Sequence, residues 1–187
     1  MIAPIDNRPA LQVGHVQVFD YDTSWLDAAL QRAAAAAEIP DFPFLGEIRH
    51  GVEDYLENKC PHTLLPLPTL FDRMRRMLHQ IGCPSMAESL QPMAPPIYLS
   101  LSDIAQRADH GFELAFFQLL REELEVLRDE GAEEIHFIDF APAVQFLCQS
   151  SSWTARCARL HDEIQCFLMS FDRSVCDSAT PVSFYQP

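Results

Sequence analysis

The sequence has almost no lysine. Of its thirteen basic residues only Lys59 is a lysine, and the net charge at pH 7 is −14. Affinity for nucleic acids and for anionic membranes depends mainly on neutralising phosphate groups with cations. We therefore expect neither as a partner. The densest basic cluster is "RMRR", so Arg73, Arg75 and Arg76 are the residues that we expect to contact an anion or an acidic partner.

Long apolar runs are also missing. A membrane-spanning helix needs about 20 consecutive apolar residues, and no segment approaches this length. The first residues, "MIAPIDNRPALQVGHVQV", lack the basic start and apolar core of a signal peptide. We therefore expect a cytoplasmic protein without a membrane partner. Its six cysteines are then expected to be free thiols, because disulfides are rare in the cytosol.

The glycine-rich loops that hold phosphate groups are absent as well. Neither G-x-x-x-x-G-K-[ST] nor G-x-G-x-x-G occurs, and no matched acid–base set stands out. The sequence thus offers no evident means of stabilising a reacting charge. This favours a function in binding over a function in turnover.

The first half of the chain has a helical pattern. We expect an arm over 1–14, a short strand over 15–19, and helices over 24–39, 44–57, 69–82 and 84–93. The third helix has the clearest apolar stripe, with the spacing i, i+3, i+4, i+7. The residues of this stripe are Leu70, Phe71, Met74, Met77, Leu78 and Ile81. Gly82 follows as a helix stop, and the whole predicts a helical domain over 15–92.

After Pro96 strands and helices alternate. Residues 97–101 have the composition of a strand, a long helix ends at Gly131, and a second strand covers 134–140. Strand, helical crossover and strand is the order of a parallel βαβ unit. A long final helix over 152–171 completes a small α/β domain over 93–172.

The last residues, 173–187, are expected to form a tail. Phe184 and Tyr185 would be exposed in such a tail, and exposed aromatic residues suggest a contact with the same domain or with a second subunit. The fold class predicted for the whole chain is α+β and predominantly helical, with a helical first half and a small βαβ-type sheet in the second half.

The first half resembles a nucleotide-sensing domain. A short strand, "WLDAALQRAA", "EIRHGVEDYL" and "LFDRMRRMLHQIGCPSMAESL" follow in the order of the ATP-cone, which stands at the front of many ribonucleotide reductases. The resemblance covers 16–91 and implies a helical fold with a nucleotide ligand. ATP-cones carry a basic Lys-Arg-Asp-Gly hairpin after the first strand, where this chain has the acidic "FDYDTS" and no evident second strand. A triphosphate needs cations or clustered N–H groups, so the resemblance supports the fold more than the ligand.

The second half, over 97–150, is similar in element order to STAS-type regulatory domains. Those domains carry a Ser or Thr switch at the start of the central helix. The corresponding stretch here is "ADHGFEL", and neither Asp109 nor His110 can be phosphorylated as that switch is. The resemblance is one of topology, and topology alone does not imply function.

Two cysteine–histidine pairs form a candidate metal site. Cys60 and His62 share one loop, and His79 and Cys83 flank the end of the third helix. Zinc takes such ligands in tetrahedral geometry, so these four residues are a candidate zinc site. The alternative is a loop histidine with unrelated thiols, because the spacing matches no standard zinc finger.

Two further positions carry chemistry. Cys157 and His161 are four residues apart on the final helix, and a thiolate beside an imidazolium would be an activated nucleophile. The alternative is a helix surface where two reactive residue types are neighbours.

Asp139 lies near the carboxyl end of a strand, where α/β sites form. The alternative is that Asp139 stabilises the N-terminus of the helix that begins near Pro142.

The leading prediction is a non-catalytic soluble regulatory or protein-interaction module, to which the ATP-cone resemblance adds nucleotide sensing. The alternative is a small metal-binding or thiol-dependent enzyme that uses its Cys and His residues. A third interpretation is an acidic protein that neutralises a basic partner. We expect a protein partner or a homo-oligomer, and the cofactor stays open between a nucleotide and zinc.

Overall fold

The computed structural model describes residues 8–110, 112–175 and 183–185, with the backbone alone for 172–175 and 183–185. The predicted α+β, predominantly helical class is confirmed. The chain divides into two compact units, Met1–Pro95 and Pro96–Pro187, each described by itself below. No helix in the described part of the chain combines the length and the apolar character needed to cross a bilayer.

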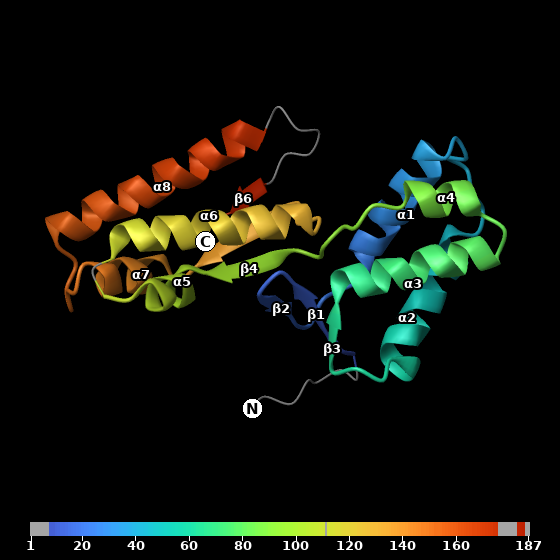
Figure 1. Cartoon of the computed structure of the whole chain (residues 1–187), viewed down its shortest axis with the longest axis horizontal. Coiled ribbons are helices and arrows are strands. Elements are labelled where there is room, and N and C mark those ends of the chain that lie inside the picture. Colours follow the sequence, from blue (N-terminus) through green and yellow to red (C-terminus); the bar gives the residue numbers. More distant parts are fainter. Residues whose placement is uncertain (1–7, 111, 176–182, 186–187) are drawn as a thin grey trace. The chain divides into compact units, whose positions relative to one another are not determined.

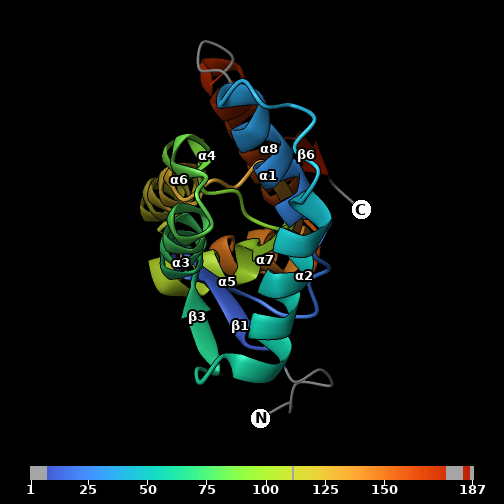
Figure 2. The same ribbon diagram turned by 90° about the vertical axis from the view of Figure 1, so that its right-hand side faces the viewer.

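The first unit combines helices with a small mixed sheet (Figure 1). In chain order its described elements are β1 (Ala10–Val13), β2 (Val16–Val18), α1 (Ser24–Ala36), α2 (Leu45–Asp54), the π-helical turn η1 (Tyr55–Lys59), β3 (Leu64–Pro66), α3 (Leu67–Gln80) and α4 (Pro84–Ser89). The strands pair in the order β2-β1-β3, with β1 antiparallel to β2 and parallel to β3. Figure 2 shows β1 and β3 side by side, and α3 continues directly from the end of β3.

The central strand of this sheet lies in the segment that we expected to be an arm. Leu11 and Val13 of β1 are fully buried. Gly14, at φ +57°, turns the chain into β2, so the first unit contains a β-hairpin although no second strand was evident from the sequence. Residues 1–7 of the expected arm lie outside the described part of the chain. The expectation was wrong for Ala10–Val13, because the strand sequence "ALQV" does not alternate apolar and polar residues. Its pairing with β3, a segment far along the chain, decides its structure.

Helix α3 carries the core of the first unit. The buried members of its predicted apolar stripe are Leu70, Phe71, Met74 and Leu78. The ring of Phe71 meets that of Trp25 on α1, with 6.1 Å between the centroids. The stripe extends past the part of α3 that other residues bury. Its residues Met77 and Ile81 are half-buried and exposed, respectively.

The predicted glycine stops are confirmed after two helices. Gly82 follows α3 at φ +84°, and Gly131 follows the long helix of the second unit at φ +90°. At the first stop, the Cys83 N–H donates to the Leu78 carbonyl (2.9 Å) and the Gly82 N–H donates to the His79 carbonyl (3.2 Å). This is the Schellman pattern, in which a left-handed residue lets two N–H groups satisfy carbonyls of the last turn.

The second unit contains the predicted small sheet. Its described elements are β4 (Ile97–Ser100), α5 (Leu101–Ala108), α6 (Glu113–Asp129), β5 (Glu134–Ile138), α7 (Phe140–Leu147), α8 (Ala155–Val175) and β6 (Ser183–Tyr185). The strand order is β4-β5-β6 with both pairings parallel, so the predicted parallel βαβ order is confirmed for β4 and β5. Both α5 and α6 lie in the crossover between these strands.

The two faces of this sheet differ in polarity. One face is buried, and its residues are Ile97, Leu99, Ile135 and Phe137. On the other face the exposed Tyr98 ring stacks on His136 with 4.8 Å between the centroids. His136 Nε2 also lies 2.8 Å from a carboxylate oxygen of Glu134. The alternation of buried and polar positions is that of a sheet covered on one side.

Helices α6 and α8 meet through long side chains, and they run side by side in Figure 1. The rings of Phe117 and Phe167 lie 5.3 Å apart between centroids. The Arg121 guanidinium lies over the Phe167 ring at 5.6 Å, and that of Arg128 lies 6.0 Å from the centroid of Phe171. Cation–π contacts of this kind hold α8 against α6 without close approach of the two backbones.

The end of the chain departs from the expected tail over 173–187. Helix α8 continues through Val175, beyond the expected domain end at residue 172. The backbone of β6 then pairs with β5, because an edge strand of a parallel sheet still offers unpaired N–H and C=O groups. The predicted exposure of the Phe184 and Tyr185 side chains lies outside the residues whose side chains are described.

Two glycine substitutions test the helix stop. Gly82→Ala should lower the free energy of unfolding of the first unit by about 1 kcal/mol, because alanine must adopt a left-handed conformation there. A Cβ at Gly82 or at Gly51 would meet nothing within 4 Å, so crowding contributes at neither position. Gly51→Ala, inside α2, is the matched control and should raise the same free energy by about 0.5 kcal/mol.

Urea unfolding in a Trp153→Phe background measures both changes. The chain has two tryptophans, so Trp25 alone then reports on the first unit. Equal effects of Gly82→Ala and Gly51→Ala would contradict the assigned helix end.

Candidate functional site: an apolar groove

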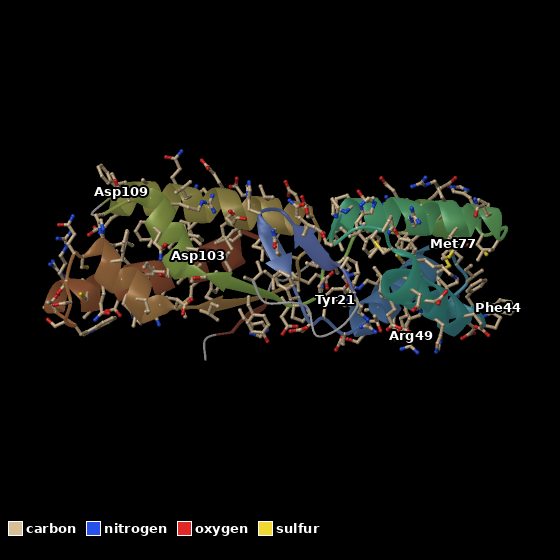
Figure 3. The ribbon with its side chains drawn as sticks, turned by 90° about the horizontal axis from the view of Figure 1, so that it is seen from below. Tyr21, Phe44, Arg49, Met77, Asp103 and Asp109 are labelled. Carbon is tan, nitrogen blue, oxygen red and sulfur yellow. The ribbon has the colours of Figure 1, made fainter. Side chains whose placement is uncertain are left out.

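The described surface of the first unit has a hollow of about 400 Å³ between the α1–α2 loop, α2 and the end of α3. We call it the apolar groove. Its lining residues are Phe42, Phe44, Glu47, Ile48, Met77, Ile81 and Cys83. Figure 3 shows two of them, with Phe44 at the beginning of α2 and Met77 on α3. Apolar side chains exposed as a group, rather than singly, mark contact sites on soluble proteins.

The loop between α1 and α2 supplies one wall of the groove. Glu38 ends α1 in a left-handed conformation at φ +63°, and the Ile39 N–H then donates to the Ala34 carbonyl at 2.9 Å. Pro40 and Pro43 in this loop have no backbone N–H to donate, which prevents a regular element from forming. The rings of Phe42 and Phe44 meet edge to face, with 5.7 Å between the centroids. Phe44 nevertheless keeps 56 % of its surface exposed.

The end of α3 supplies the other wall. Met77 and Ile81 belong to the apolar stripe of this helix, and the residues that cover the stripe stop short of them. Ile81 keeps 52 % of its surface exposed. The turn at Gly82 brings Cys83 into the lining. The sequence predicted this stripe correctly, but it did not show at which residue of α3 the burial of the stripe ends.

The charged residues that line the groove and the hollow beside it are acidic. Glu47 lines the groove, and Asp41 lines an adjoining hollow of about 340 Å³ that shares Phe42 with it. The lining of neither hollow includes an Arg or a Lys. Arg49 of α2 is instead held by Asp27 of α1 at 3.4 Å. The arrangement suits an apolar ligand with positive flanks.

The three arginines predicted to bind an anion do not converge on one point. The Arg73 guanidinium lies over the Tyr55 ring, 4.3 Å from its centroid. Arg75 donates from Nε and Nη2 to the Leu90 carbonyl (3.2 and 3.0 Å) and from Nη1 to the Asp72 carboxylate (2.7 Å). Arg76 donates to the Asp72 carbonyl at 3.3 Å. Arg75 therefore has a structural role, since it joins α3 to the end of α4.

The four predicted zinc ligands lie at opposite ends of α3. Cys60 and His62 precede β3 and the start of the helix, where the Cys60 thiol donates to the His62 carbonyl at 3.8 Å. His79 and Cys83 lie at the other end of this 14-residue helix, about 21 Å away along its axis. Among the described residues no three Cys, His, Asp or Glu side chains are placed to share a metal ion. The structure thus keeps the two pairs apart.

The predicted thiol site has a different partner from the expected one. The Cys157 sulfur accepts a hydrogen bond from the Thr154 hydroxyl at 3.2 Å and lies 3.9 Å from the Ser152 carbonyl oxygen. The His161 ring instead lies against Trp153, with 5.9 Å between the centroids. Hydrogen bonds with Thr154, and secondarily with Cys148, lower the pKa of Cys157 below its ordinary value.

Asp139 occupies the end of β5 that the sequence singled out. It stands at the N-cap of α7 in a left-handed conformation (φ +61°), which agrees with the helix N-terminus interpretation. Its carboxylate accepts a hydrogen bond from the Ser100 hydroxyl at 3.0 Å. Ser100 in turn caps α5 by accepting from the Asp103 N–H at 3.2 Å. The pair ties together the carboxyl ends of β4 and β5.

Comparison of the chain with protein-family models, with curated proteins and with solved structures gives no match. The functional conclusion therefore rests on the residues of this chain.

Two arginine substitutions test whether Arg75, and not Arg76, stabilises the first unit. Arg75→Ala should lower the free energy of unfolding of the first unit by about 1.5 kcal/mol, because it leaves the Leu90 carbonyl without a charged donor. Arg76→Ala, on the exposed side of the same helix, should change it by less than about 0.5 kcal/mol. Chemical denaturation followed by circular dichroism measures both values. Equal costs would contradict the role assigned to Arg75.

Proposed function

We propose that this protein is a non-catalytic docking module, and that its first unit binds a basic amphipathic helix of a partner protein in the apolar groove. The observation that carries the proposal is the exposure of Phe44 and Ile81 on the two walls of one hollow. Two aromatic or aliphatic walls with an open space between them suit the apolar face of a helix. We place this function in the cytoplasm, where thiols such as those of Cys60 and Cys83 stay reduced.

The charge of the molecule selects among possible apolar partners. Glu47 and Asp41 are the charged residues that line the two adjoining hollows, and the chain as a whole carries a net charge of −14. A partner helix with lysine or arginine beside its apolar face would meet complementary charge at both hollows. An acidic helix of equal hydrophobicity would be repelled. The occupant is therefore a basic amphipathic helix.

The polar groups that could suggest catalysis are used in other ways. Ser100 and Asp139 meet at the carboxyl end of parallel strands, where α/β enzymes place reacting groups. The Ser100 hydroxyl accepts from the Asp103 N–H, which caps α5, and donates to Asp139, which joins the ends of β4 and β5. This use supports a binding function over a catalytic one.

For nucleotide sensing, which the ATP-cone resemblance adds, the described hairpin at the start of the first unit offers no cation to a triphosphate. The β1–β2 hairpin turns at Gly14 and His15, without a lysine or an arginine. The rings of Trp25 and Phe71 meet between α1 and α3 and are buried, so neither ring is open to a nucleotide base. The docking function that we propose is therefore independent of nucleotide.

A labelled peptide tests the groove directly. An amphipathic peptide with Leu and Phe on one face and Lys on the other should raise its fluorescence anisotropy when titrated with the full chain. Phe44→Ser should weaken its binding at least about tenfold, because one large apolar side chain contributes about 1.5–3 kcal/mol on burial. Ile81→Ser should act in the same direction. Both side chains are exposed, so neither change should disturb the fold.

Two controls keep this test specific. Leu114→Ser removes an exposed apolar side chain from the second unit and should leave peptide binding unchanged. The same peptide with Glu in place of Lys should bind at least about tenfold more weakly, since like charges then meet. Binding that is indifferent to Phe44→Ser and Ile81→Ser would reject the groove as the docking site. Self-association that Phe44→Ser abolishes would instead identify a second copy as the occupant.

A thermal melt tests independence from nucleotide. With about 5 mM ATP or dATP the melting midpoint should not move, whereas a ligand at a hundred times its Kd would stabilise the native state by about 2.7 kcal/mol. Differential scanning fluorimetry with magnesium alone as the reference measures the shift. A rise in the melting midpoint that depends on the nucleotide would instead support nucleotide sensing.

A further inference from the structure

The second hollow, of about 340 Å³, lies beside the apolar groove and is formed by one short segment. Its lining residues are Ile39, Pro40, Asp41, Phe42 and Pro43, all in the loop that joins α1 to α2. We call it the loop hollow. Phe42 also lines the groove, so the two hollows lie on either side of one residue. A helix seated in the groove would therefore have the loop hollow near one of its ends.

A tight turn fixes the shape of the loop hollow. The Phe42 N–H donates to the Ile39 carbonyl at 3.1 Å, which closes a β-turn. Pro40 occupies the second position of this turn, where its ring fixes φ, and Asp41 occupies the third. Pro43 follows the turn directly. The backbone on both sides of Asp41 is thus restricted before a ligand arrives, so binding there orders little that was free.

The lining combines apolar walls with a carboxylate. Four of its five residues are hydrophobic or proline, and the remaining one is Asp41, whose side chain is exposed. Arginine and lysine have the matching composition, because each places a charged head on a long apolar stem. The stem of such a side chain can contact the walls while its head meets the carboxylate. The loop hollow therefore suits one basic side chain.

The Asp41 carboxylate has no hydrogen bond or ion pair within the described part of the chain. Other carboxylates of the first unit are held by a cation. Asp27 pairs with Arg49 at 3.4 Å, and Asp72 pairs with Arg75 at 2.7 Å. Asp41 is thus open to a cation that a partner supplies, and such a charge-assisted hydrogen bond is among the stronger polar contacts of proteins.

We propose that the loop hollow is a subsite for one arginine side chain of the docked partner, and that Asp41 selects this side chain. The inference rests on the docking function proposed above and adds a residue that the partner must carry. Arginine is preferred over lysine because its planar guanidinium can bond both carboxylate oxygens and can lie flat against a ring such as that of Phe42.

The place of the arginine in the partner follows from the two hollows. The apolar face of the partner helix fills the groove, and the loop hollow begins beyond Phe42. Side chains three or four residues apart lie on the same face of a helix. The arginine is therefore expected three or four residues beyond one end of the apolar stripe of the partner.

Peptide binding to the full chain tests this subsite. Two labelled peptides share one apolar stripe and carry a single arginine, about four residues before the stripe in one and after it in the other. Citrulline, which has the shape of arginine without the charge, replaces it in the reference peptides. One of the two arginine peptides should bind about fivefold more tightly than its reference. Lysine at this position should give an intermediate affinity.

Two isosteric variants assign the preference to Asp41. Asp41→Asn should remove the difference between arginine and citrulline, because the carboxylate is lost while the turn is kept. Glu38→Gln is the matched control, since it changes the net charge equally in an exposed residue outside both linings. It should keep the fivefold difference at about 0.15 M salt, where charges more than about 8 Å apart are largely screened.

The outcomes separate the subsite from the groove. Binding that Phe44→Ser weakens, but that does not distinguish arginine from citrulline, would reject the subsite and leave the docking groove in place. A preference for arginine that persists in Asp41→Asn, or that Glu38→Gln removes equally, would do the same. Binding that Phe44→Ser leaves unchanged would reject the groove and the subsite with it.

Discussion

The contact between α3 and its neighbours is the interaction on which the first unit depends. The stripe of α3 is buried where Phe71 meets Trp25. It is longer than the surface that covers it, so Met77 and Ile81 reach past the core before the turn at Gly82. The same periodicity that builds the core therefore also builds one wall of the groove. Fold and candidate site have one physical origin here.

Local patterns in the sequence predicted much of this fold. Helical periodicity and the glycine stops at Gly82 and Gly131 depend on neighbouring residues alone, and these predictions were confirmed. The strand order of β4 and β5 followed from chain order. Strand β1 was missed because its structure depends on pairing with β3, a distant segment of three residues with no pattern of its own.

The sites were harder to predict than the fold because they depend on distances across the structure. The length of α3 already separates Cys60 from Cys83, and this could have been inferred from a helix of 14 residues. The Arg75 guanidinium, however, donates a hydrogen bond to the Leu90 carbonyl at the end of α4. This is a tertiary contact that no pattern in the sequence indicates.

The long helix of the second unit is attached unevenly along its length. Toward its end, contacts such as Arg121 over Phe167 join the tips of flexible side chains, which can follow a small displacement of the backbone. At its beginning, Arg156 forms an ion pair with Glu113, and the buried Cys157 sulfur accepts a hydrogen bond from the Thr154 hydroxyl. Shear between packed helices costs least where the contacts are long and adaptable. A small displacement of α8 over α6 would therefore be taken up by these side-chain tips, while the buried residues of α8 keep the helix in place. These residues are Cys157, Leu160, Ile164 and Leu168.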